Sequence, residues 1–298
     1  HIMTRSTTSG ELMVVVVVTR ADIPKADRLV ELLRAVVPDL CSVCLSVNSR
    51  RTNVILGTDI RVLWGKAAME DTLCGLHFAV SPLSFFQVNP KQTEKLYGLA
   101  LDYAGLTGNE TVVDAYCGAG TISLLLAQKA KKVIGIEIVP EAIQNANENA
   151  ARNNIANAEF RVGATEELLP QLVADGLRPD VIVLDPPRKG CDPAVLQAII
   201  AAAPKRVVYV SCGAPTLARD AKLLAEGGYA AEKVQCVDMF CWTGAVETVM
   251  CFSKETYPQR SVKVEFPLEG LNVAQLQGSA TYEQIKAYVL EHSGLKVS

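Results

Sequence analysis

The chain has 298 residues, of which 49% are hydrophobic and 20% charged, and its formal net charge is −3 with a pI of about 5.8. Such a chain is globular, buries a large core and is long enough for two domains, or for one with extensions. No apolar run approaches the roughly 20 residues of a membrane-spanning helix, so we expect no membrane segment. The slightly acidic balance also lacks the basic footprint of a complete nucleic-acid-binding protein.

The numbers of cysteines and histidines limit the kinds of catalytic and metal site that the chain can form. Nine cysteines, an odd number scattered among apolar runs, favour a reducing compartment over a disulfide framework, and we expect a cytoplasmic protein. With only three histidines, His-based zinc hydrolysis and Ser-His-Asp catalysis are poorly supported. Cys41 and Cys44 have metal-ligand spacing, but no second pair accompanies them. We therefore predict no metal site and keep a metal at this pair as the alternative.

The N-terminal part shows short β-rich runs and a single helical pattern. We expect residues 1–10 to be a leader, in which His1-Ile2 is an expression remnant, and residues 11–84 to form a small α+β domain. Apolar residues at helical spacing predict a helix over Lys25–Val36. Turn residues between the later strand-like runs favour an antiparallel sheet there. The strand-like runs are Leu12–Thr19, Ser42–Val47, Asn53–Leu56, Ile60–Trp64 and Leu76–Val80.

The stretch Thr111–Ala127, TVVDAYCGAGTISLLLA, predicts a buried strand ending near Asp114, a glycine turn and a helix. Such a unit presents unpaired backbone N–H groups to a ligand. A second apolar run ends in Glu137, about twenty residues past the first glycine, Gly118, where a nucleotide-binding unit places the carboxylate that accepts from ribose hydroxyls. An ordinary βα turn is the alternative. Ser123 at the place of a third glycine argues against a dinucleotide.

From Thr111 to Phe252 strand-like and helical runs alternate, which predicts a doubly wound parallel sheet. The last two strand-like runs, near 229–237 and 246–252, have no helix between them and should form an antiparallel hairpin. With a helix that starts after an Asn89 cap, this gives seven strands and six helices, the arrangement of a class I, Rossmann-like methyltransferase.

We therefore expect a methyltransferase domain over residues 85–253, with ligands at the carboxyl ends of its strands. A C-terminal extension should follow over residues 254–298. It contains a strand-like run at Val262–Phe266 and a helical pattern near Tyr282–Glu291.

Three further residues with chemical potential fall at predicted strand ends. Asp185 ends an apolar strand and is followed by two prolines, which fix the next loop. Cys212 lies between a buried strand and a helix N-terminus, which is expected to lower the thiol pKa and to favour a nucleophile. Glu247 enters the final strand among apolar neighbours, where a carboxylate is costly unless it faces a polar site, so it is a general-base candidate. An ordinary turn at Asp185 and a structural cysteine at Cys212 are the alternatives.

Six motifs between Ser81 and Phe252 together closely resemble the RNA uracil-5-methyltransferase family, whose members make 5-methyluridine in ribosomal or transfer RNA. In chain order they are SPLSFFQVNP, DAYCGAGTISL, GIEIVPEAIQNANENAARN, DPPRKG, VYVSC…TLARD and DMF…T…VETV. Residues 11–80 resemble the family's central domain, and the tail resembles an extension of some bacterial members. We find no counterpart of the family's N-terminal RNA-binding TRAM barrel, or of the cysteine cluster that holds an iron–sulfur centre in some members, and expect a truncated chain.

The resemblance implies a cofactor, S-adenosylmethionine, and roles for single residues. Cys212 matches the family's nucleophile and Glu247 its base. The matches to cofactor-binding positions are Gln87, Tyr116, Gly118, Glu137 and Asp185. The implied partner is RNA, and we expect ribosomal rather than transfer RNA and a monomeric enzyme.

The implied chemistry explains these residue types. Carbon C5 of uracil is a poor nucleophile, so a thiolate adds to C6 and creates an enolate that attacks the methyl group. A base then removes the C5 proton and the thiolate is eliminated. Asp185, near the sulfonium and the base, is expected to help position both. The target base must leave its stack, and we expect Phe85 or Phe86 to stack on it.

The chain departs from the family's pattern at two places. After Cys212 the family usually has Asn or Asp and then Pro, whereas here Gly213 and an alanine precede the proline. Ahead of Glu247 the family often has two histidines, where this chain has Trp242 and Ala245. Neither change removes the nucleophile or the base, and both concern the surroundings of the target base.

Two other readings are weighed against this one. Methylation of cytosine C5 or of an exocyclic amine is the nearest. Cytosine-C5 methyltransferases usually place their nucleophile after Pro or Thr, whereas here Ser211 precedes Cys212. Amine methyltransferases favour an aromatic residue after Asp-Pro-Pro, whereas here Arg188 occupies that position. A catalytically silent RNA-binding module is the reading from another class. The presence of both Cys212 and Glu247 argues against it.

Overall fold

The computed structural model describes residues 1–50 and 54–254, which lie in one compact unit. The strand and the helix expected near Val262–Phe266 and Tyr282–Glu291 fall outside the described residues. All nine cysteines lie within them as free thiols. No helix of the described ranges is long and apolar enough to cross a membrane.

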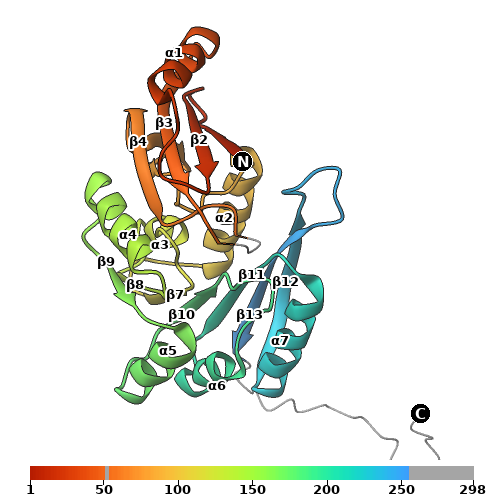
Figure 1. The fold of residues 1–298 in the computed structure, drawn as a ribbon. Coiled ribbons are helices and arrows are strands. Elements are labelled where there is room, and N and C mark those ends of the chain that lie inside the picture. The colour runs from red at the N-terminus through yellow and green to blue at the C-terminus, as the bar shows by residue number, and fades with distance from the viewer. Residues whose placement is uncertain (51–53, 255–298) are drawn as a thin grey trace, which may run out of the picture. The chain divides into compact units, whose positions relative to one another are not determined.

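A seven-stranded sheet forms the larger part of the fold, with the order β12-β13-β11-β10-β7-β8-β9 (Figure 1). All pairings among β7 to β11 are parallel, and β13 runs antiparallel to both β11 and β12. The strands are β7 (Thr111–Ala115), β8 (Lys132–Glu137), β9 (Ala158–Val162), β10 (Val181–Leu184), β11 (Arg206–Ser211), β12 (Tyr229–Val237) and β13 (Glu247–Lys254). The predicted class I methyltransferase fold, with its antiparallel final hairpin, is therefore confirmed.

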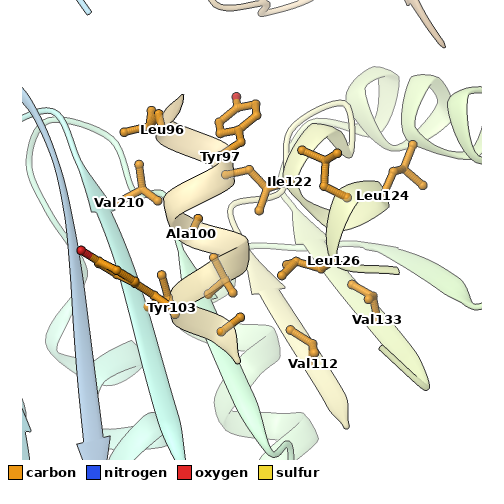
Figure 2. Packing of buried hydrophobic residues seen from close by; sticks show 14 of the residues in the cluster. Leu96, Tyr97, Ala100, Tyr103, Val112, Ile122, Leu124, Leu126, Val133 and Val210 are labelled. Atoms are coloured by element: carbon orange, nitrogen blue, oxygen red, sulfur yellow. The ribbon is translucent and has the colours of Figure 1, made fainter. Parts of the chain in front are cut away.

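Helices cover both faces of this sheet. They are α2 (Pro90–Ala104), α3 (Thr121–Ala127), α4 (Pro140–Arg152), α5 (Thr165–Ala174), α6 (Pro193–Ala202) and α7 (Ala214–Glu226). Successive strand residues point to opposite faces. In β7, accordingly, Val112 belongs to the apolar cluster under α2 and α3, and Val113 to the cluster under α5, α6 and α7. Figure 2 shows Tyr97 and Ala100 of α2 beside Ile122 of α3 in the first of these clusters.

The start of α2 is fixed by its cap. The Asn89 side chain accepts a hydrogen bond from the Gln92 backbone nitrogen (3.3 Å), and Pro90 occupies the first turn, as the sequence predicts. The Asn89 Nδ2 also donates to the Met239 carbonyl (3.2 Å) in the loop between β12 and β13. One side chain therefore holds both the helix start and that loop.

The N-terminal part forms a smaller sheet, β1-β2-β3-β4, and a hairpin, β5-β6. The bounds are β1 (Ile2–Ser6), β2 (Leu12–Val18), α1 (Ala26–Val36), β3 (Leu40–Val47), β4 (Asp59–Gly65), β5 (Met69–Leu73) and β6 (Leu76–Val80). The later strands β3 and β4 pair antiparallel as predicted, while α1 carries the chain across so that β2 and β3 pair parallel. The structure differs from the sequence-based prediction at three places. Residues 1–10, expected as a leader, contain β1, which pairs with β2. Residues 54–56 form no strand, and the strand β5 was not predicted.

Asn149 of α4 and Asn153, which caps the C-terminus of that helix, attach the hairpin β5-β6 to the larger part of the fold. His77 N donates to Asn153 Oδ1 (2.8 Å), and Asn153 Nδ2 donates back to His77 O (2.7 Å). Asn149 accepts from Ala79 N (3.0 Å) and donates to Ala119 O (3.2 Å) in the glycine turn. These amides satisfy backbone groups along β6, since a strand edge otherwise leaves them unpaired.

We expect Asn89→Ala to lower the free energy of unfolding by about 1–3 kcal/mol, because it removes both the cap and the bond to the Met239 carbonyl. Asn89→Ser keeps a capping oxygen and loses only the hydrogen bond to the Met239 carbonyl, so its loss of stability should be smaller. Urea unfolding followed by circular dichroism measures both. Equal losses in the two variants would show that the cap contributes nothing.

Candidate active site

A cavity of about 600 Å³ lies at the carboxyl ends of the parallel strands. All seven residues predicted from the sequence line it, together with Phe85, Phe240, Arg188 and others. The seven are Gln87, Tyr116, Gly118, Glu137, Asp185, Cys212 and Glu247. Residues separated by up to 160 positions in the chain are thus gathered around one space.

The glycine turn and Glu137 form one side of the cavity. Gly118 N donates to Glu137 Oε2 (3.2 Å) and Val139 N donates to Oε1 (2.9 Å), so two backbone amides fix this carboxylate at the end of β8. Tyr116 and Gly118 both have left-handed backbone angles, with φ of 68° and 54°. A Cβ on Gly118 would meet nothing within 4 Å, so the backbone angle and not crowding favours glycine there.

Asp185 and Glu247 contribute two further carboxyl groups to the cavity wall. Burial raises the pKa of Asp185 to about 8, with further contributions from the charges of Glu247 and Asp114. Glu247 is only 5% exposed, and burial raises its pKa as well, while the Arg188 guanidinium acts in the opposite direction. Two poorly solvated carboxyls, one of which raises the pKa of the other, are suited to hold a proton or to attract a cation.

The pKa of Cys212 does not follow the sequence-based expectation. A lowered value was expected from the helix N-terminus, yet burial and the charges of Glu247 and Asp185 raise it. The positive charge of Arg188 and a backbone hydrogen bond counter this rise only in part. Desolvation and the two negative charges therefore raise the pKa of Cys212 on balance.

Asp114 is a buried group whose importance the sequence reading missed. It is fully buried on β7, and Ser123 Oγ donates to its Oδ2 (2.5 Å). Its Oδ1 is buried with no hydrogen-bond partner among the described residues. Burial raises the pKa of this carboxyl to about 7. The only sequence signal was its place at the strand end before the glycine turn, which indicates equally well a simple strand terminus.

The two neighbouring phenylalanines have different environments. Phe86 packs against Phe78 with ring centroids 6.0 Å apart and against the core, whereas Phe85 is 74% exposed and lines the cavity. Phe85 alone of the two is thus available to a ligand. In the loop before β13, Trp242 is fully exposed with a left-handed φ of 68°, at one of the positions where the chain departs from the family pattern.

The fold and site define a class I methyltransferase: the sheet order, the antiparallel β13 and the ligand-binding edge are those of that class. The family model described as tRNA (uracil-5-)-methyltransferase matches residues 4–255. The chain belongs to this family.

Relatives agree with the family assignment. The chain is 51% identical over 250 residues to an uncharacterized RNA methyltransferase of Halalkalibacterium halodurans, covering 84% of this chain and 55% of the relative. It is 53% identical over 251 residues to one of Listeria innocua, with the same shares. The chain thus spans about half the length of the curated relatives that it matches.

Solved structures agree as well. The crystal structure of tRNA (uracil-54, C5)-methyltransferase from Pyrococcus abyssi, in complex with S-adenosyl-L-homocysteine, matches with a TM-score of 0.71 and 30% identity, over 84% of this chain and 59% of that one. Trm5b from Pyrococcus abyssi matches with a TM-score of 0.54 and 15% identity, over 81% and 72%, and supports the fold alone.

We expect Asp114→Asn to change how stability depends on pH. The folded-state pKa of Asp114, about 7, lies above the ordinary 3.8, so the folded state retains a proton that the unfolded state loses. Its contribution is complete below pH 4 and is lost as pH rises to 7, at no more than about 1.4 kcal/mol per pH unit. The variant lacks this titration and should gain stability relative to the wild type between pH 5 and pH 8.

Urea unfolding at pH 5, 6, 7 and 8 measures the effect, with the exposed Asp175→Asn as a matched control. Titration of Asp185 leaves a residual slope in every variant. The same pH dependence in Asp114→Asn and in the wild type would contradict the prediction.

Proposed function

We propose that this chain transfers a methyl group from S-adenosylmethionine to C5 of uracil in RNA, with Cys212 as the nucleophile and Glu247 as the base. The observation that carries the proposal is a single cavity of about 600 Å³. The Cys212 thiol, the buried Glu247 carboxyl and the Glu137 carboxylate all line it. A covalent uracil methyltransferase needs these groups within reach of one base and one cofactor.

The cavity suits S-adenosylmethionine in its chemistry. The Glu137 carboxylate, held by two amides, is an acceptor for ribose hydroxyls. Tyr116 and the exposed Ile138 offer apolar surface to a purine. Burial raises the pKa of Asp185 to about 8, and a sulfonium bound beside it would favour its ionised form. The bound cofactor would supply an electrophilic methyl group. We propose Gln87 and Gly118 as further contacts, since both line the same cavity.

In the proposed reaction, Cys212 loses its proton to solvent and its Sγ forms a bond to C6 of uracil, which moves an electron pair onto C5 and the adjacent carbonyl. That electron pair would form the bond from C5 to the methyl group, with S-adenosylhomocysteine as the leaving group, and Glu247 then removes the C5 proton. The electron pair left behind restores the C5–C6 double bond and expels Sγ. Burial raises the pKa of Glu247, which makes its ionised form a stronger base. Phe85, exposed at the cavity, is proposed to stack on the flipped uracil.

For the RNA itself we propose ribosomal RNA, the expectation from sequence, and we assay transfer RNA in parallel because the matching family description and the Pyrococcus relative name tRNA. The test is methyl transfer from labelled S-adenosylmethionine to both RNA classes, prepared without 5-methyluridine, followed by nucleoside analysis. Labelled 5-methyluridine supports the proposal. Labelled 5-methylcytidine or a methylated amine, without 5-methyluridine, would overturn it, and binding of RNA without transfer would favour a silent module.

The role of Cys212 predicts a covalent complex. RNA with 5-fluorouridine at the target should trap the unmodified enzyme, because fluorine cannot leave as a proton does. Cys212→Ala should lose at least about a thousandfold in turnover and should form no adduct, since covalent catalysis is removed outright. Denaturing gel electrophoresis detects the adduct, and cofactor titration shows whether the variant still binds S-adenosylmethionine. An active Cys212→Ala protein is incompatible with this mechanism.

The role of Glu247 predicts a different outcome for Glu247→Gln. The amide is nearly isosteric and cannot remove a proton, so addition and methyl transfer should proceed while elimination stalls. We expect a denaturation-resistant protein–RNA adduct that carries the methyl label and decays at least about a hundredfold more slowly than the wild-type intermediate. Loss of activity with no labelled adduct would assign Glu247 a positioning role.

A further inference from the structure

The loop Pro186–Cys191, which follows β10, is attached to the buried carboxylate of Asp220 on α7. Cys191 N donates to Asp220 Oδ2 (2.8 Å), and so does the hydroxyl of Tyr209 on β11 (2.6 Å). Arg219 Nε donates to Oδ1 (2.8 Å). Asp220 has no exposed surface, so this carboxylate is held entirely by protein donors. A buried carboxylate with three donors fixes everything that is attached to it.

Arg219 and Thr216 extend the attachment along the same loop. The Nη2 of Arg219, oriented by its ion pair with Asp220, donates to the carbonyls of Lys189 and Cys191 (both 3.1 Å). One turn earlier on α7, Thr216 Oγ1 lies 3.3 Å from the Arg188 carbonyl. The backbone from Arg188 to Cys191 is thus bound at several points to one face of α7.

Gly190 shows that the loop is shaped for this contact. A Cβ there would lie 2.6 Å from Arg219 Nη2 and 2.7 Å from Asp220 Oδ2, and its φ of +77° is the left-handed value that glycine tolerates. A side chain at this position would push the loop away from the carboxylate. The loop can therefore approach α7 this closely only because residue 190 is a glycine.

The attachment links two parts of the cavity wall. The loop carries Arg188, which lines the cavity, and α7 begins two residues after Cys212. We propose that Asp220 is a positioning residue, which holds the Pro186–Cys191 loop on α7 and thereby keeps Arg188 facing Cys212 and Glu247. This inference rests on the proposed function in one respect, namely that Cys212 is the nucleophile.

The charges around Cys212 supply a readout. The groups facing its thiol are the carboxyls of Glu247 and Asp185, which raise its pKa, and the Arg188 guanidinium, which lowers it. If the loop is released from α7, the Arg188 guanidinium no longer lies near the Cys212 thiol and no longer lowers its pKa. The pH midpoint of Cys212 alkylation should then rise, independently of how accessible the thiol becomes.

The experiment measures iodoacetamide alkylation of Cys212 in the whole chain between pH 6 and pH 10.5, by mass spectrometry of its peptide, without RNA or cofactor. Asp220→Asn should move the midpoint upward by roughly half to one unit, a three- to tenfold smaller thiolate fraction below it. Arg188→Gln should produce the same shift. Lys222→Gln, on the exposed face of α7, is the matched control and should leave the midpoint unchanged.

The double variant Asp220→Asn/Arg188→Gln separates positioning from general loosening. If Asp220 acts through Arg188, the double variant has the midpoint of Arg188→Gln alone. A further rise, or an unchanged midpoint in Asp220→Asn, would overturn the proposal. Should Asp220→Asn fail to fold, Arg219→Gln removes the part of the attachment that runs through the ion pair with Asp220, while the bonds from Cys191 and Tyr209 to Asp220 remain. Its midpoint should rise by less than that of Arg188→Gln, and an unchanged midpoint would overturn the proposal. Failure here leaves the methyl-transfer assay unaffected, so the two proposals are judged separately.

Discussion

The in-register pairing of β7, β10, β11 and β13 determines where Asp185, Cys212 and Glu247 lie. Leu184 of β10 pairs with Ala115 of β7 and with Tyr209 of β11, so these strands end at one edge of the sheet. The strand β13 runs the opposite way, and its second residue, Thr248, pairs with Ser211. Its first residue therefore lies at the carboxyl edge. This reversal brings Glu247 beside Cys212, and a parallel seventh strand would have placed the carboxylate at the far end.

The edge collects negative charge in a poorly solvated space. Asp114, Asp185 and Glu247 all have raised pKa values, burial being the largest cause in each, and the cation that acts on Cys212 and Glu247 is Arg188. Such a site is unfavourable for a thiolate and favourable for a bound cation, because added positive charge stabilises every ionised carboxyl around it. A bound sulfonium would therefore also favour the thiolate form of Cys212, which the proposed reaction requires.

Local sequence signals were sufficient for the larger sheet and insufficient for contacts between distant elements. Strand, turn and helix over Thr111–Ala127 follow from apolar spacing and glycine, and the strand ends then imply a common edge. The strand β5 was missed because Met69–Leu73 is half polar, and β1 because its pairing with β2 is a tertiary property. The raised pKa of Cys212 was missed for the same reason, since the opposing carboxylates come from other strands.

The clearest case of this limit is the departure after Cys212. Gly213 has an extended φ of −146°, so its backbone does not demand glycine. Crowding gives a physical account instead: a Cβ would lie 3.0 Å from Thr216 Oγ1 and 3.6 Å from the Arg188 carbonyl. The missing side chain lets the first turn of α7 approach the Pro186–Cys191 loop. Gly213 is the N-cap of α7 and offers no capping side chain, and its backbone nitrogen donates to Ser211 Oγ (3.1 Å). The glycine that replaces Asn or Asp after Cys212 is thus part of the contact between the turn at Cys212 and the Pro186–Cys191 loop.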